Sequence, residues 1–289
     1  MTEKTHKLYI NTLISITLAV TLYLIYDGFS YYFTPLEERF YHDKHANLKP
    51  SGFAGHGYGI IGTILILIGV FGYMIRKRYK RFSRVGVLKY WLEFHIFLCV
   101  LGPILILFHT AFKFGGIVSI SFWSMVAVVL SGVIGRFIYK QIPRTIQGRE
   151  LNIQEIQNIK SQIQENLQSH IVLEENKSKL LNIIEGTTVP SVKKQTITGF
   201  FKRFRADQFR IKKIKSGLID LGIAQKDRKN IIQLTKREYT IQRRIEYLGL
   251  MQRLFRYWHV AHLPFAIIML LIMVVHVIVA VTFGYKWIF

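Results

Sequence analysis

The chain contains a single cysteine, Cys99, which lies within an apolar run. One cysteine cannot form a disulfide within the chain, a CxxC metal-binding pair or a CxxCH haem-attachment motif. These kinds of site are excluded within this chain, and we expect Cys99 to be a small buried side chain.

Acidic residues are also scarce. The sequence has 17 Asp and Glu against 39 Lys and Arg, a formal charge of +22, although 51% of its residues are apolar. A soluble globular domain rarely combines so much positive charge with so much apolar surface. A membrane protein does so by placing apolar runs in the lipid and basic residues in the loops. The composition therefore predicts an integral membrane protein in contact with membrane lipid.

Five apolar runs reach the roughly 20 residues that a helix needs to cross a bilayer core of about 30 Å. The runs cover residues 8–26, 57–75, 90–112, 117–139 and 258–283. The first is longer than a usual signal segment and no small-x-small cleavage site follows it, so we expect it to be retained. The predicted fold class is all-α, a bundle of about five transmembrane helices with a basic, mainly helical insertion. Residues 1–139 hold four spans, residues 140–257 form the insertion, and residues 258–289 hold the fifth span and a short tail.

The basic residues predict the orientation. The loop at residues 76–89 carries seven Lys and Arg and no acid, and residues 140–257 carry 24 Lys and Arg against 11 Asp and Glu. Residues 27–55 carry four acids and three bases. The positive-inside rule places the first two segments in the cytoplasm and the third outside, in a protein of the bacterial inner membrane. Attraction to anionic lipid explains the basic insertion without a nucleic-acid partner, which we do not expect.

Four of the ten histidines form a pattern. His95 and His109 lie 14 residues apart in the third span, and His262 and His276 lie 14 apart in the fifth. In a helix, 14 residues return to nearly the same face and rise roughly 21 Å. Both spans run outward, so His95 and His262 should share an inner level and His109 and His276 an outer one. Two facing imidazoles at each of two levels predict two bis-histidine b-type haems, in which these four residues are the iron ligands.

Other residues are weaker candidates. Gly102 lies seven residues from each histidine of the third span, where a missing side chain would admit a porphyrin edge, although helix packing explains one glycine equally well. Arg136 ends the fourth span and is a candidate partner for an inner haem propionate. His259 is an alternative inner ligand or a propionate partner. His56 and Glu93 are candidates for a quinone site and are taken as unpaired, and His6, His42, His45 and His170 are expected to be solvated.

A GxGxxG motif at Gly57, Gly59 and Gly62 is not interpreted as a nucleotide site. No strand precedes it, and basic residues rather than an acid follow about 20 residues later. We expect these glycines to pack against neighbouring helices.

The spacing of the two histidine pairs within five spans resembles that in the transmembrane domain of ferric reductases and NADPH oxidases. In that domain, two haems are bound between the third and fifth spans. The pattern is also similar to bacterial cytochrome b subunits that link a quinone pool or a cytoplasmic donor to other redox proteins. This chain has no dinucleotide fingerprint, and its large insertion is foreign to the first family, so the second likeness is favoured. The resemblance implies an electron-transfer subunit of an oxidoreductase complex. Its partners would be a multihaem cytochrome, an iron–sulfur protein or a flavoprotein, with a quinone as a further cofactor.

Three alternatives remain open from the sequence. The chain could be a non-redox membrane sensor or scaffold that recruits a partner through the insertion. The histidines could instead bind another metal or form a proton relay. A proton-coupled transporter is disfavoured, because spans one, two and four contain almost no charge and no inverted repeat is visible.

Overall fold

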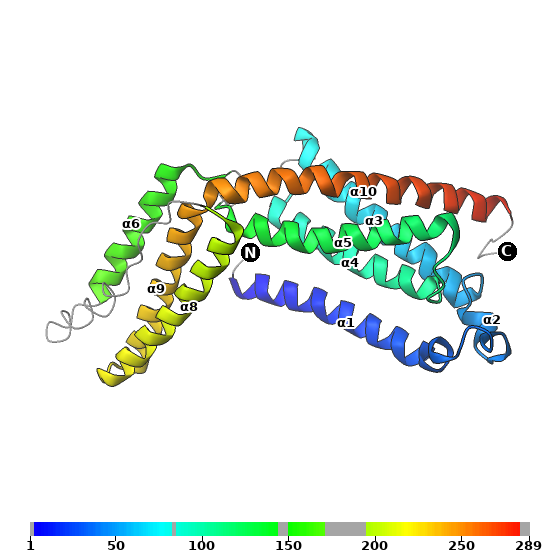
Figure 1. Cartoon of the computed structure of the whole chain (residues 1–289), viewed down its shortest axis with the longest axis horizontal. Helices are drawn as coiled ribbons and strands as arrows, with labels where there is room; N and C mark the ends of the chain where they lie inside the picture. The colour runs from blue at the N-terminus through cyan, green and yellow to red at the C-terminus, as the bar shows by residue number, and fades with distance from the viewer. Residues whose placement is uncertain (1–2, 83–84, 144–149, 171–194, 284–289) are drawn as a thin grey trace. The chain divides into compact units, whose positions relative to one another are not determined.

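The computed structural model describes residues 3–82, 85–143, 150–170 and 195–283. Every regular element in these ranges is a helix, as Figure 1 shows. The long helices are α1 (Glu3–Phe33), α3 (Phe53–Arg78), α4 (Leu88–His109), α5 (Gly116–Gln141), α6 (Ile153–His170), α8 (Ile197–Asp220), α9 (Gln225–Glu246) and α10 (Leu248–Thr282). The short ones are η1 (Arg39–Tyr41), α2 (His45–Leu48) and η2 (Lys80–Phe82).

Five of the described segments are long and apolar enough to cross a membrane: α1, α2 with α3, α4, α5 and α10. This confirms the predicted all-α fold class. The fifth spanning helix begins at Leu248, ten residues before Trp258. The apolar spacing of Ile241, Ile245 and Leu248 predicts one helix that continues into the fifth span, and this is wrong, because Ile241 and Ile245 belong to α9. The chain leaves the helical conformation at Tyr247 (φ −109°, ψ 12°), whose side chain is fully buried.

The chain divides into two compact units. The membrane unit comprises Met1–Ile134, Ile146–Gly148 and Trp258–Phe289, and the basic unit comprises Gly135–Thr145 and Arg149–Tyr257. The boundary before Trp258 coincides with the division made from the sequence. The other boundary lies inside α5, so the last turns of this helix pack with the basic unit.

Contacts within the membrane unit give the direction of each helix. α1 and α4 run parallel: His6 contacts Glu93 at one end (Nε2 to Oε2, 2.9 Å), and the Tyr32 hydroxyl donates to the Phe108 carbonyl at the other (3.4 Å). α5 and α10 run antiparallel, since the Ser121 hydroxyl donates to the Met269 carbonyl (3.0 Å) and Ser131 contacts His262. These directions are those of successive helices that cross a bilayer alternately. The helices lie alongside one another in Figure 1.

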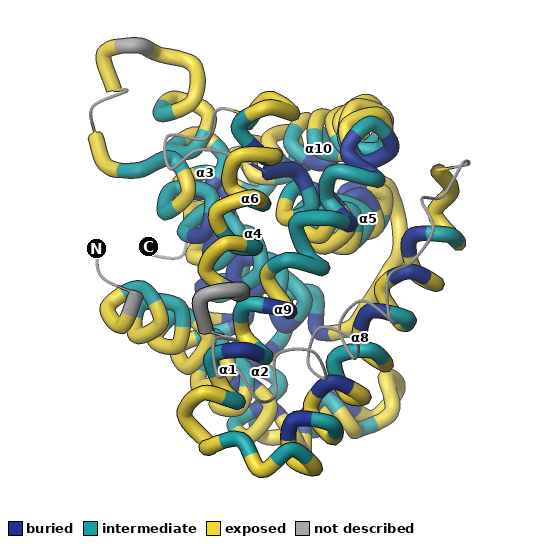
Figure 2. Tube along the Cα trace, turned by 90° about the vertical axis from the view of Figure 1, so that its left-hand side faces the viewer, coloured by how far each residue is buried: buried dark blue, intermediate teal, exposed yellow. Residues whose placement is uncertain are grey.

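Large apolar side chains cover the outward faces of the spanning helices. On α10, for example, Val260, Leu271 and Ile278 are exposed, whereas Met269 and Met273 are buried. Figure 2 shows the same division as exposed stretches along α1 and α10. In water such a surface would be unfavourable by about 25 cal/mol per Å², so lipid contact accounts for it.

The turn after α4 is held by one buried arginine. Ala111 and Phe112 both have left-handed backbone conformations (φ 48° and 60°), which are strained for residues with a side chain. Arg39 donates to the carbonyl oxygens of Ala111 (2.6 Å), Tyr32 (2.6 Å) and Thr34 (2.9 Å). These bonds fix the strained turn directly after His109.

The basic unit contains an α8–α9 hairpin and α6, which packs on α9. Gly222, with φ +68°, makes the turn between α8 and α9, where only glycine is unstrained. Ile214, Leu218 and Ile231 form the buried core of the hairpin. α6 begins with a reciprocal capping box, in which the Asn152 side chain accepts from the Glu155 amide and the Glu155 carboxylate accepts from the Asn152 amide (2.7 and 2.8 Å).

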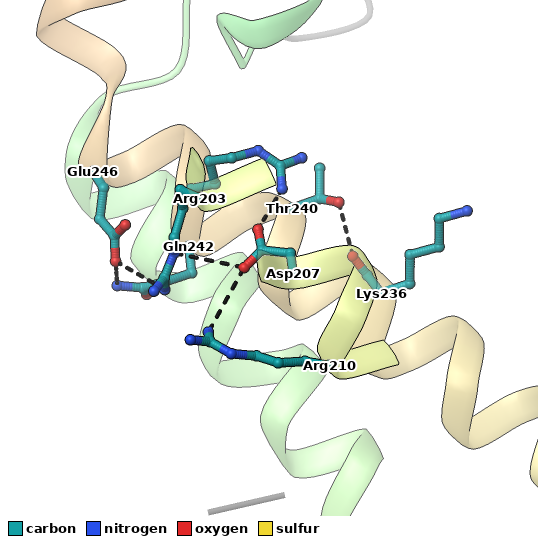
Figure 3. A network of polar contacts seen from close by, with 8 residues as sticks. Arg203, Asp207, Arg210, Lys236, Thr240, Gln242 and Glu246 are labelled. Carbon is teal, nitrogen blue, oxygen red and sulfur yellow. Dashed lines mark hydrogen bonds and ion pairs between the residues drawn. The ribbon is translucent and has the colours of Figure 1, made fainter. Parts of the chain in front are cut away.

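A buried ionic network joins α8 to α9 (Figure 3). The Asp207 carboxylate accepts a hydrogen bond from Arg243 and lies 3.6 Å from Arg203 and 3.8 Å from Arg210. Arg203 also reaches Glu246 at 3.5 Å. Burial raises the pKa of the Asp207 carboxyl, and the three guanidinium groups offset only part of this effect.

Candidate haem-binding histidines

α3 and α4 touch backbone to backbone at one pair of glycines. A Cβ added to Gly62 would lie 2.8 Å from the Gly102 carbonyl oxygen, and one added to Gly102 would lie 2.8 Å from the Gly62 carbonyl oxygen. No side chain fits at either position. Gly102 therefore serves helix packing, and its predicted contact with a porphyrin edge stays a prediction. The packing interpretation of the GxGxxG motif is confirmed for Gly62 and for Gly59, which faces the His109 ring.

The same seam holds two of the predicted ligands. Seven residues from the glycine contact in one direction, His109 Nδ1 lies 2.8 Å from the Gly55 carbonyl oxygen. Seven residues in the other direction, His95 Nδ1 lies 2.9 Å from the Gly69 carbonyl oxygen. α3 thus presents one backbone carbonyl to each histidine of α4, at the same 14-residue spacing as the histidines themselves.

These hydrogen bonds decide which ring nitrogen carries the proton. A carbonyl oxygen can only accept, so Nδ1 of His95 and of His109 must be the donor. In the neutral imidazole the Nε2 atom is then the unprotonated one, with a lone pair for a metal. This is the usual outer-sphere arrangement of a metal-binding histidine.

At the outer level the structure brings His109 and His276 together. Their ring centres are 6.4 Å apart, and the ring planes make an angle of 59°. Two imidazoles that bind one metal from opposite sides, at about 2.0 Å each, place their ring centres roughly 6.3 Å apart. The pair therefore fits an iron with two axial histidines. His56 also lies beside His109, at 6.3 Å, and competes with His276 as the second ligand.

At the inner level, His262 of α10 is close enough to His95 for charges on the two imidazole rings to interact. His262 Nδ1 is 2.6 Å from the Ser131 hydroxyl, and this hydroxyl donates its own proton to the Val128 carbonyl (2.9 Å). Ser131 must then accept from Nδ1–H, so His262 also has an unprotonated Nε2. The Trp258 ring lies 4.8 Å from the His262 ring and donates through Nε1 to the Ser131 carbonyl (2.7 Å).

His259 is exposed and its ring packs edge-on against Trp258 (4.7 Å). It lies at the same end of the membrane unit as His262. Its alternative roles, as an inner haem ligand or as a partner of a haem propionate, stay predictions. Arg136 belongs to the basic unit, where its guanidinium lies over the Tyr139 ring at 5.9 Å. Its predicted contact with a propionate therefore also stays a prediction.

Two expectations about polar residues are wrong. Glu93 was taken as unpaired and His6 as solvated, yet Glu93 is buried and bonded to His6, whose ring also lies 5.4 Å from Tyr90. His42 and His45 are half-buried around the Tyr31 ring, and His45 Nδ1 is 3.3 Å from the Tyr31 hydroxyl. The side chain of His170 lies outside the described residues. Desolvating a carboxylate without a partner is costly, which favours such pairing.

Three contributors to the site were missed in the sequence: Gly55, Gly69 and Ser131. Each acts through a group that has no distinctive sequence signal, namely a backbone carbonyl or a serine hydroxyl. One signal was available, because Gly55, Gly62 and Gly69 repeat at seven-residue intervals, the interval that separates His95, Gly102 and His109.

Among the described residues, no three His, Cys, Asp or Glu side chains converge as ligands of a metal ion. Zinc sites in proteins take three or four such ligands. A bis-histidine haem takes two from the protein, because the porphyrin supplies the rest.

Comparison with known proteins adds no relative: no family model matches the chain, no curated protein matches its sequence, and no solved structure matches its fold.

Proposed function

We propose that this chain is a dihaem b-type cytochrome subunit that transfers electrons across or within the membrane. His95 and His262 would hold the inner haem, and His109 and His276 the outer one. The observation that carries the proposal is the outer pair. The two rings lie at the spacing of axial ligands, and the Gly55 carbonyl leaves Nε2 of His109 unprotonated.

Bound haem supplies one-electron chemistry through its iron. The residues of this chain hold and orient it. The Gly55, Gly69 and Ser131 oxygens fix three of the four imidazole rings and increase their basicity. The buried side chains of Met269 and Met273 lie between the two histidine levels of α10 and keep water away from the space between them.

The electron donor would be a quinone pool or a cytoplasmic donor, and the acceptor a separate redox subunit. The charge distribution supports an orientation with the N-terminus and the basic unit in the cytoplasm. The likeness to bacterial cytochrome b subunits favours the bacterial inner membrane as the location. In such a complex the chain would act as the electron-transfer subunit of an oxidoreductase.

The test is a dithionite-reduced minus oxidised absorption spectrum of the purified chain, with pyridine haemochrome quantitation. We expect two b-type haems per chain, and one in His109→Ala or His276→Ala. His56→Ala is the matched control and should retain both.

Absence of haem from folded protein produced with haem supplied would refute the proposal. Retention of two haems in His276→Ala, with loss of one in His56→Ala, would move the outer ligand to His56.

A second candidate is a non-redox sensor or scaffold. The division into two compact units favours it, because the basic unit has its own core and could recruit a partner. In that case the histidine substitutions would leave the absorption spectrum unchanged and featureless.

A further inference from the structure

One face of α8 combines exposed aromatic and basic side chains. Phe201, Phe204, Phe209 and Ile219 are 51%, 41%, 71% and 50% exposed. The exposed basic residues between them are Lys202, Arg205, Lys212, Lys213 and Lys215. At 100° per residue, these positions spread over about half of the helix circumference, the half that faces away from the buried residues.

The opposite face of α8 packs into the basic unit. Phe200, Arg203, Asp207, Ile214 and Leu218 are its buried residues. Asp207 is the only acid of α8 before Asp220, and it points into the buried network, as Figure 3 shows. From Phe201 to Ile219, the exposed side of α8 therefore presents positive charge and aromatic rings with no acidic side chain of its own, over about five turns of helix.

The first turn of α8 is anchored to a spanning helix. The Phe201 ring stacks on Phe137 of α5, with ring centres 6.1 Å apart and planes at 8°, and Phe200 meets the same ring edge-on at 6.1 Å. Phe137 lies in the last turns of α5, which ends at Gln141. α8 therefore begins beside the last turns of α5, within the basic unit.

We propose that this face of α8, from Phe201 to Ile219, docks on the anionic surface of the bilayer. Phenylalanine rings insert at the boundary between headgroups and acyl chains, and lysine and arginine side chains extend to lipid phosphates. Basic residues close to such a surface each add to the attraction, and five lie on this face. Charge complementarity and the anchor at Phe137 favour lipid over a soluble protein partner. The inference does not depend on haem binding.

The experiment uses the full chain with Cys99→Ala and a nitroxide label on Gln208→Cys, an exposed position between Phe204 and Phe209. The matched control carries the label on Gln233→Cys, an exposed glutamine of α9. Both are reconstituted in vesicles of phosphatidylcholine and in vesicles of equal phosphatidylcholine and phosphatidylglycerol. We expect a several-fold loss of access to a water-soluble nickel reagent at position 208 in the anionic vesicles only, with no change at position 233.

A second variant, Lys212→Glu with Lys213→Glu and Lys215→Glu, should abolish the difference between the two vesicle types. The proposal is overturned if position 208 stays equally accessible to the nickel reagent in both vesicles, which would leave the face for a protein partner. It is also overturned if the triple glutamate variant is immersed as deeply as the parent. Circular dichroism and the label at position 233 report whether each variant is folded.

Discussion

The proton on three imidazole rings is fixed by single oxygen atoms. His95, His109 and His262 each donate through Nδ1 to a carbonyl or hydroxyl oxygen, so Nε2 of each is free to bind a metal. The histidines were found from their spacing alone. Their hydrogen-bond partners were not, because a glycine carbonyl is chemically the same as every other carbonyl in the chain. Only the fold shows which one faces a histidine.

Gly59 offers a direct test of how closely α3 must approach His109. A Cβ at this position would lie 2.8 Å from His109 Nδ1. Gly59→Ala gains roughly 0.5–1 kcal/mol of helix propensity, but overpacking costs about 1–3 kcal/mol, so the steric term should dominate. We expect a lower unfolding temperature in detergent, and loss or alteration of one haem signal in the low-spin electron paramagnetic resonance spectrum.

Gly132→Ala is the control for this substitution, because an added Cβ there meets no atom within 4 Å. It should leave both haem signals intact and should not lower the unfolding temperature. An unfolding temperature and spectrum for Gly59→Ala that match those of Gly132→Ala would show that the close approach to His109 has no effect.

The spanning helices were predictable because lipid imposes a minimum length and an apolar composition on them. The ends of the helices were less so. α10 starts at Leu248 rather than continuing from α9, although Ile241, Ile245 and Leu248 keep a helical spacing. The pattern of apolar residues continues through the break, because Tyr247 is itself buried where the chain changes direction. Periodicity reports burial, and burial does not require an unbroken helix.

The Asp207–Arg243 pair tests the energetics of the α8–α9 hairpin. Removing one partner of a buried pair costs about 3–5 kcal/mol, because the other charge stays buried. In Arg243→Met, the Asp207 pKa should rise further above its unfolded value. The penalty should therefore be absent below the unfolded pKa, where Asp207 is protonated in both states, grow as pH rises from the unfolded to the folded pKa, and stay constant above that. Hydrogen exchange of the α8 and α9 amides should show lost protection at neutral pH and partial recovery at acid pH.

Arg237→Met, at an exposed position of α9, is the control and should keep normal protection at each pH. Adding Asp207→Leu to Arg243→Met should restore part of the protection at neutral pH by removing the buried carboxylate that has lost its hydrogen-bond donor. Equal loss of protection at both pH values would mean that lost packing, not the carboxylate, destabilises the variant.

On the scale of the whole molecule, the charge distribution predicts which segments face each side of the membrane. Glu37 lies in the segment expected outside, and Lys226 lies in the first turn of α9, which is expected inside; both are exposed. In a Cys99→Ala background, a membrane-impermeant maleimide should label Glu37→Cys in intact cells. Lys226→Cys should be labelled only after lysis. The reverse pattern would invert the proposed orientation and exchange the inner and outer histidine levels.

The arrangement of α3 against α4 has a consequence for the direction of electron flow. The pairs Gly55–His109, Gly62–Gly102 and Gly69–His95 follow one another at seven-residue steps in opposite chain directions. The two histidines of α4 therefore lie at equal distances along the helix from the central glycine contact, and each faces one carbonyl oxygen of α3. The bond from Nδ1 to an α3 carbonyl is the same at both levels, so it does not by itself distinguish the entry site from the exit site of the proposed cytochrome. Differences between the two levels lie in the other neighbours of the rings: Ser131 and Trp258 adjoin His262, whereas His56 of α3 adjoins His109.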